Sequence, residues 1–133
     1  MISKKTLAIA VAAVAVAAAS PAFSHHSVTQ YFDLSKTASI SGTVEEFRFV
    51  NPHSILVLKV RGANGQEETW RAESSPVAWL VRNGWKPSMF KRGQQLTIMG
   101  NTTRDPKVKM LRLQTVKFPD GKTLNANTGE GVR

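Results

Sequence analysis

The three histidines, His25, His26 and His53, are the residues whose types and positions best suggest chemistry. His25 and His26 are neighbours that follow a run of small residues, and His53 ends an Asn-Pro-His triplet. Neutral imidazole nitrogens are common metal ligands. Because the chain has no cysteine, thiolate metal sites, cysteine nucleophiles and disulfides are excluded. The histidines therefore indicate a metal site with nitrogen ligands as the candidate chemistry.

Residues 1–24 have the pattern of a signal peptide, which decides where the mature chain begins. Lys4 and Lys5 precede an unbroken apolar run of 13 residues, which is short for a membrane span. We expect cleavage after Ser24, because Ala22 and Ser24 then occupy the positions that must be small. Cleavage after Ala22 is one alternative, and an uncleaved anchor is another. The pattern predicts a periplasmic or secreted protein with no transmembrane segment after cleavage.

Cleavage after Ser24 would make His25 the first residue and would give it two ligand atoms. Its α-amine and Nδ1 can chelate one ion, and an imidazole from His53 completes a T-shaped set of three nitrogens, which is called a histidine brace. Planar nitrogen-rich sites suit Cu(II), and the amine gives up its proton as the metal binds. The sequence thus predicts copper as the cofactor, with His25 and His53 as ligands and His26 assisting.

Two other interpretations of the histidines remain open. Cleavage after Ala22 would start the chain with Phe23-Ser24-His25, and a histidine in third place binds Cu(II) or Ni(II) through the amine, two backbone amides and its imidazole. Alternatively, His25 and His26 are an ordinary polar terminus and His53 caps a turn. The first alternative keeps the same class of metal, whereas the second removes the site.

Length and charge limit the number of domains and the class of partner. Removing 24 of the 133 residues leaves 109, enough for one domain with its own core. We expect that domain over residues 25–124 and a flexible tail over residues 125–133. Removing Lys4 and Lys5 lowers the formal charge from +9 to +7, which is ordinary for a soluble surface.

The same charge allows a second class of partner, an anionic polymer of the cell wall or an anionic membrane lipid. Export separates the chain from nucleic acid, which is therefore not an expected partner. The basic residues that would bind such a polymer are Lys86, Lys91, Arg92, Lys107 and Lys109.

His53 follows a long strand that the alternation of apolar residues predicts over residues 39–49. In a regular strand the side chain of Val44 would point to one face, whereas the two phenylalanines that follow it would point to the other. One extra residue near Glu45-Glu46, a β-bulge, would bring all three side chains to one face and coil the strand. Pro52 then blocks further ladder pairing. We therefore expect His53 at the end of a strand, close to solvent.

The other elements follow from alternation and from turn residues. A serine before Pro76 predicts a capped helix that Gly84 ends. A change of alternation near Gln114-Thr115 predicts a second bulge, and a frayed tail is expected from Thr123 onward. The further predicted strands cover residues 54–61, 67–73, 94–100 and 108–118. Residues 86–92 form a basic connector or contain a second helical turn.

The order of these elements predicts a mainly β protein. Three strands, one short helix and two more strands, with a coiled first strand, match the small five-stranded Greek-key barrel called the OB-fold. An open sandwich with a similar number of strands is the alternative.

Carboxylates offer weaker candidates for chemistry. Glu45 and Glu46 could form a catalytic pair, but neighbours on a strand face opposite ways, and we favour a bulge acid. Glu73 ends a predicted strand and could accept a hydrogen bond from a histidine N–H; an acid in the first turn of the helix that follows is the alternative. The sequence shows no Ser-His-Asp spacing, phosphate-cradling glycine loop or catalytic carboxylate pair, so we expect no enzymatic activity.

Sulfur and aromatic side chains are the last candidates. Alternation predicts that the side chains of Met99 and Met110 lie on the outer faces of their strands. There they could attract Cu(I), although methionine more often fills gaps in a core. Trp70 and Trp85 are expected in the core. Trp79 is expected at the surface, where it could stack against bases or sugars.

The sequence resembles an uncharacterised family of short exported bacterial proteins, family 6152 of the domains of unknown function. The resemblance covers nearly all of the mature chain, and the His-His-Ser start and the Asn-Pro-His triplet are its most specific parts. It implies export and domain boundaries rather than an activity. Pro106 departs from the family, whose members often have glycine after the late aspartate. The other matching residues are Phe32-Asp33, Gly42-Thr43-Val44, Phe49, Trp70, Glu73, Gly84-Trp85, Gly93, Gly100 and Arg104-Asp105.

Three functions are consistent with these features. The leading hypothesis is an exported β-barrel that binds or transfers copper through His25 and His53. The second is a barrel that binds an anionic polymer through its basic residues. The third is a structural accessory subunit of an exported enzyme complex, with an exported protein as the partner.

Overall fold

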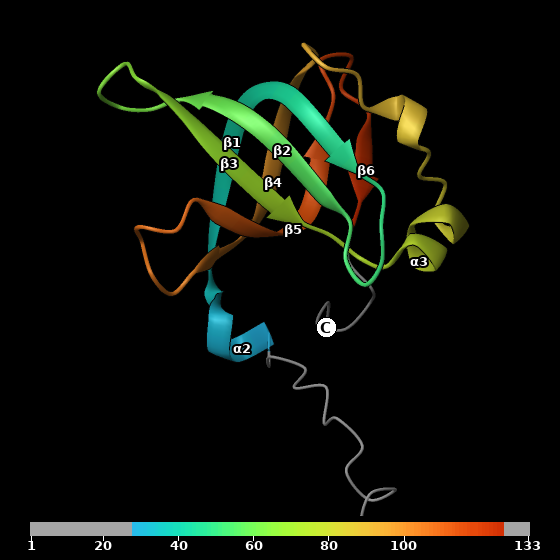
Figure 1. Cartoon of the computed structure of the whole chain (residues 1–133), viewed down its shortest axis with the longest axis horizontal. Coiled ribbons are helices and arrows are strands. Elements are labelled where there is room, and N and C mark those ends of the chain that lie inside the picture. Colours follow the sequence, from blue (N-terminus) through green and yellow to red (C-terminus); the bar gives the residue numbers. More distant parts are fainter. Residues whose placement is uncertain (1–27, 127–133) are drawn as a thin grey trace, which may run out of the picture.

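Six strands and three short helices make up residues 28–126, the part of the chain that the computed structural model describes (Figure 1). The protein is mainly β, as the sequence predicts. In chain order the elements are α2 (Val28–Tyr31), β1 (Phe32–Arg48), β2 (Ile55–Arg61), β3 (Glu67–Glu73), α3 (Val77–Arg82), the 3₁₀ helix η1 (Pro87–Met89), β4 (Gln95–Thr103), β5 (Met110–Lys117) and β6 (Thr123–Asn125).

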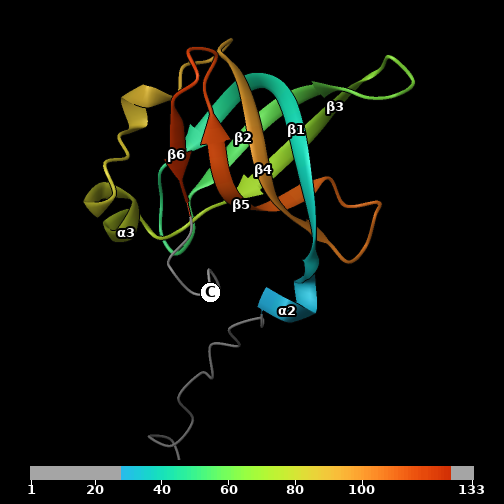
Figure 2. The ribbon, with the colours of Figure 1, turned by 180° about the vertical axis from the view of Figure 1, so that it is seen from behind.

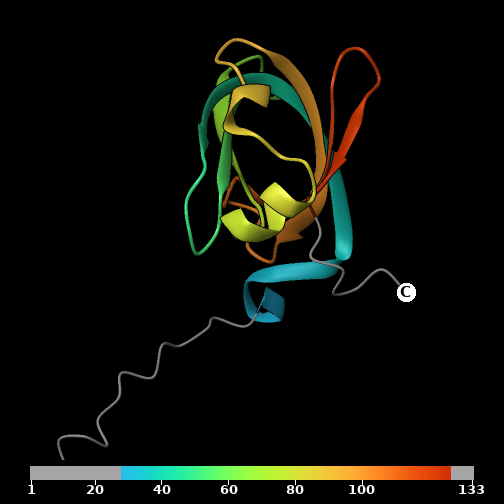
Figure 3. The same ribbon diagram turned by 90° about the vertical axis from the view of Figure 1, so that its right-hand side faces the viewer.

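Five of the strands form a closed ring of hydrogen bonds. β1 pairs with β2 and β4, β2 pairs with β3, and β4 pairs with β5, all in antiparallel orientation. Parallel pairing of Arg71–Glu73 in β3 with Met110–Arg112 in β5 closes the ring. β6 pairs with the other end of β5 (Figure 2). Figure 3 shows the strands curving around a common interior.

The core fills the interior of this ring. Leu56 and Leu58 of β2 are fully buried, as the alternation in the sequence predicts. Aromatic rings gather around Phe90, whose centroid lies 4.5 Å from that of Phe47 and 5.3 Å from that of Trp85. The buried apolar residues of the core are Val44, Leu56, Leu58, Ala72, Leu80, Trp85, Phe90, Leu96, Ile98, Leu111, Leu113, Val116 and Ala126.

Both predicted β-bulges are present. Val44 pairs with Leu58 while Glu46 pairs with Val57, so Glu45 is the extra residue in β1. In β5 the pairing skips Gln114 in the same way. Each bulge moves the apolar residues that follow it onto the inner face, which is why one strand can line the core on both sides of its bend.

The bounds of most strands differ from the prediction by a few residues, β4 for example extending to Thr103, and the largest differences lie in β1 and after β5. β1 begins at Phe32 rather than at residue 39, and its first half pairs with β4. The first residues of the tail expected to fray from Thr123 instead form β6, because a turn at Gly121 (φ 87°) folds them back onto β5; the rest of that tail, residues 127–133, lies outside the described part of the chain. Ala126 at its end is 2 % exposed. The described strands therefore number six, not five.

The helix α3 also differs in part from the prediction. Leu80 is fully buried, and Gly84 has the positive φ of 83° that a helix-ending glycine supplies. However, Val81 is 56 % exposed, although helical spacing puts it on the same face as Val77 and Leu80 and so predicts its burial. Trp79, which was expected at the surface, is partly buried and packs against the core. The six-residue helix is too short for its periodicity to fix which face is buried.

No helix among residues 28–126 is long and apolar enough to cross a membrane.

Candidate functional site

His53 lies in the loop between β1 and β2, and its imidazole contacts the carboxylate of Glu73. The contact joins Nδ1 of His53 to Oε1 of Glu73, the last residue of β3. The side chains are 47 % and 23 % exposed, so the pair lies at the surface. The strand pairing explains the contact, because Ile55, two residues after His53, pairs with Glu73. The structure thus confirms His53 near solvent and Glu73 as its neighbour.

The carboxylate determines how the imidazole can act. An acceptor next to Nδ1 favours the tautomer that carries its hydrogen there, which leaves the lone pair on Nε2. Nε2 has no hydrogen-bond partner within residues 28–126. Histidines that bind metals usually donate their other N–H to a carboxylate or carbonyl in this way.

The loop that carries His53 is fixed to the chain before α3. The backbone N–H of Ser74 donates to the carbonyl of Ser54 at 2.8 Å, and the N–H of Ser54 donates to the carbonyl of Ser75 at 3.3 Å. The Ser54 hydroxyl donates to the Val50 carbonyl across the turn at 3.2 Å. These bonds hold the Asn-Pro-His corner against the end of β3, where Glu73 lies.

Asn51 connects the same corner to α3. Its side-chain oxygen accepts a hydrogen bond from the Val77 N–H, the first amide of the helix, at 3.0 Å. The predicted serine cap is therefore wrong. The Ser75 hydroxyl instead donates to the Ala126 carbonyl at 2.7 Å. The sequence contains no local signal for the observed cap, because Asn51 lies 26 residues before Val77.

We predict that the substitution Asn51→Ala lowers the free energy of unfolding by about 1 kcal/mol, the usual effect of removing a side-chain helix cap. Chemical denaturation of the wild type and the variant measures the difference. Asn51→Asp is the matched control, because it keeps an oxygen acceptor and should remain close to the wild type. Equal losses in both variants would contradict the role of Asn51 as a cap.

His25 and His26, the other predicted ligands, lie outside the described residues. The first described residue is Val28, at the start of α2. All three views place α2 and the loop between β1 and β2 at the same end of the molecule (Figures 1–3). Within residues 28–126, no group of three or more His, Asp or Glu side chains is placed to hold a metal ion. The described residues therefore supply His53 and its carboxylate neighbour only.

Glu45 and Glu46 do not form a catalytic pair. Glu45, the bulged residue, lies 3.6 Å from the ammonium of Lys59. Glu46 accepts a hydrogen bond from Arg48 Nε at 2.9 Å, and this bond holds the pKa of the Glu46 carboxyl below its usual value. Each carboxylate has its own cationic partner, which agrees with the interpretation as bulge acids.

The tryptophan and methionine candidates lie in the core or on the strands of the ring. Trp85 is 1 % exposed, and its indole N–H donates to the Asn125 carbonyl at 3.0 Å. Trp70 is partly buried and donates to Glu68 at 3.2 Å. Both tryptophans therefore have structural roles. Met99 is 45 % exposed, whereas Met110 is partly buried at the pairing of β3 with β5.

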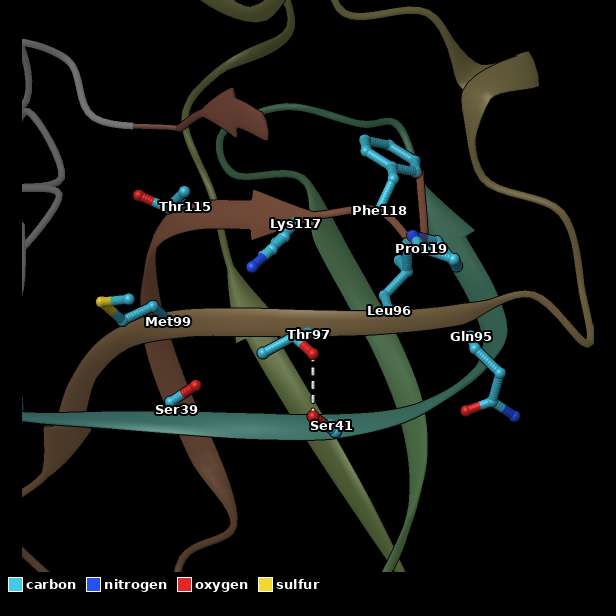
Figure 4. A pocket seen from close by; sticks show the side chains of 10 residues that line it. All are labelled: Ser39, Ser41, Gln95, Leu96, Thr97, Met99, Thr115, Lys117, Phe118 and Pro119. Atoms are coloured by element: carbon cyan, nitrogen blue, oxygen red, sulfur yellow. Dashed lines mark hydrogen bonds between the residues drawn. The ribbon is translucent and has the colours of Figure 1, made fainter. Parts of the chain in front are cut away.

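A groove of about 510 Å³ lies on the outer face of β1, β4 and β5 (Figure 4). None of its lining residues is histidine, aspartate or glutamate. Two of its hydroxyls, those of Ser41 and Thr97, are hydrogen-bonded to each other at 2.8 Å. Its outward side chains come from three strands, so the sequence alone did not reveal the groove. It offers hydroxyl groups, one amide, one ammonium and one thioether rather than a set of metal ligands.

Comparisons with known proteins identify a family but no activity. No significant match was found among curated proteins or among solved structures. A family described as being of unknown function, DUF6152, matches residues 11–112, which include α2, the Asn-Pro-His corner and Glu73. The chain therefore belongs to the DUF6152 family.

Proposed function

We propose that this protein is exported to the periplasm and binds copper through His25 and His53, with His26 assisting. The observation that carries the proposal is the contact between the Glu73 carboxylate and Nδ1 of the exposed His53. This contact fixes the imidazole and directs its free Nε2 outward as a ligand. The role that we propose for this site is copper binding or copper transfer.

The position of α2 supports the second ligand. Tyr31, the last residue of α2, lines a hollow together with Arg71 of β3. Glu73 is two residues further along β3 and therefore points to the same face, roughly 7 Å away. His25 precedes Val28 by three residues, which span roughly 10 Å when extended. We propose that this segment runs toward Glu73 and brings the N-terminal imidazole and amine to His53.

The fold supports an OB-like barrel as the scaffold. The ring joins the strands in the order β1, β2, β3, β5 and β4, and α3 lies between β3 and β4. This connectivity matches that of the five-stranded Greek-key barrel, and β6 extends it at β5. A closed ring argues against the open sandwich, which would leave strand edges unpaired.

The alternative of an anionic polymer has less support. The connector that contains η1 and the turn between β4 and β5 lie at opposite corners of the molecule (Figures 1 and 2). The basic residues proposed for polymer binding are divided between these two segments, so they form no single surface. The third candidate, an accessory subunit with an exported partner, is supported by the exposed apolar side chains of Val50 and Val81, at 50 % and 56 %.

Two measurements on the purified exported protein test the proposal. Intact mass spectrometry identifies the first residue and shows whether a metal accompanies the chain. Isothermal titration with Cu(II) should then show one site with a dissociation constant below about 10 μM, equivalent to about −7 kcal/mol. Weaker binding by a chain that begins at His25 would exclude the copper site.

A further inference from the structure

A small hollow lies on the outer face of the ring, where β3 and β5 pair in parallel. Its volume is about 300 Å³, and Tyr31, Thr69, Arg71, Val108, Lys109 and Met110 line it. The backbone N–H of Arg71 donates to the carbonyl of Lys109 at 3.1 Å. This bond holds the two cationic residues next to each other at the rim of one hollow.

The charges of the hollow are only partly compensated. Lys109 lies 3.6 Å from a carboxylate oxygen of Glu68 and 5.4 Å from the centroid of the Trp70 ring. Arg71 has no ion pair within residues 28–126. After the pairing of Lys109 with Glu68, the guanidinium of Arg71 is the charged group of the lining that no carboxylate contacts within residues 28–126. An anion would therefore find an available partner in this hollow.

The uncharged lining residues add hydrogen-bond donors and a partly apolar wall. The Thr69 hydroxyl accepts a hydrogen bond from Lys59 Nζ at 2.9 Å, which leaves its own hydrogen free to donate. Tyr31 brings a second hydroxyl to the lining. Val108 and Met110 give one side of the lining an apolar surface, and lower local polarity strengthens an ionic contact. We infer that the hollow binds a phosphate group, which guanidinium and hydroxyl donors recognise together.

The phosphate group could belong to free inorganic phosphate or to a phospholipid headgroup. The second source is included because Tyr31, which lines the hollow, is 45 % exposed, and Val28 and Leu34, three residues before and after it in the sequence, are 37 % and 45 % exposed. Apolar side chains beside cations are typical of surfaces that bind anionic membranes. Neither source requires the copper site, so His53→Ala should leave phosphate binding unchanged.

Calorimetric titration with inorganic phosphate and co-sedimentation with phosphatidylglycerol vesicles test the inference at constant ionic strength. Arg71→Gln should weaken the binding of at least one probe about tenfold or more, because hydrogen bonds to a charged group are lost. Arg71→Lys keeps the charge but not the fork of donors, and it should restore only part of the affinity. Binding of phosphate identifies the free ion as the source, and binding of vesicles alone identifies the headgroup.

Arg82→Gln is the matched control, because it removes the same charge from α3, which contributes no residue to the hollow. This variant should bind as the wild type does. Three outcomes would overturn the inference: no binding of either probe, binding unchanged by Arg71→Gln, or an equal loss in Arg71→Gln and Arg82→Gln. Because both arginines are exposed, each variant should keep the fold, and circular dichroism checks this.

Discussion

Replacing Gly100 by alanine should lower the free energy of unfolding by about 3 kcal/mol or more. A Cβ atom at this position would lie 2.1 Å from the carbonyl oxygen of Arg112 and 2.9 Å from its carbonyl carbon. These are backbone atoms of the neighbouring strand, so no side-chain rotation can relieve the overlap. β4 and β5 would have to separate next to the bulge at Gln114, where their pairing already shifts.

Urea unfolding of the variant measures this loss, and Gly62→Ala provides the matched control. At Gly62 an added Cβ would meet the end of the flexible Glu68 side chain at 3.0 Å. That side chain can rotate away, so the control should lose less than about 1 kcal/mol. If the two variants unfold at the same urea concentration, the backbone contact at Gly100 is less rigid than the structure indicates.

The substitution His53→Ala should weaken Cu(II) binding by more than about 100-fold. Removing only the hydrogen-bond partner of a metal ligand already lowers metal affinity by up to about that factor, and this substitution removes the ligand itself. The variant keeps the His25 and His26 segment, so any copper that still binds reports the N-terminal ligands by themselves. His53 is exposed, and its loss should hardly change the free energy of unfolding. Calorimetric titration and the electron paramagnetic resonance spectrum of Cu(II) measure the change in affinity and in ligand number.

Glu73→Gln distinguishes a ligand from a positioning residue. Glutamine keeps an oxygen that accepts a hydrogen bond but loses the charge, so we expect affinity to fall by only about tenfold. The spectrum should keep the same number of nitrogen ligands, because His53 still binds. Copper affinity that is unchanged in His53→Ala would show that the Asn-Pro-His corner does not bind the metal.

Local patterns in the sequence predicted much of the sheet. The bounds of the third strand are those predicted, because alternation and turn residues mark both ends of Glu67–Glu73. The bulges at Glu45 and Gln114 were predictable because each one changes the alternation of apolar residues. β6 was missed because its three residues, Thr-Leu-Asn, are too few and too polar to show a strand pattern. It is held by pairing with β5 and by the burial of Ala126.

The candidate site was predictable only where it depends on residues that are close together in the sequence. Pro52 ends the pairing of β1 and so indicates an exposed His53, and Glu73 was recognised as an acid at a strand end. The cap that Asn51 gives to α3 depends on the approach of two segments that are distant in sequence. The hollow beside Arg71 depends in the same way on the pairing of β3 with β5. Such tertiary contacts leave no trace in local periodicity.

The parallel pairing of β3 with β5 has a consequence for how the chain folds. Arg71 and Met110 must meet across α3 and β4 before the ring can close, and such distant contacts form late because the intervening chain loses entropy. A chain that stops before Met110 would leave β3 and β4 with open edges, which favour association with other chains. Synthesis of β5 therefore decides whether the earlier strands remain soluble.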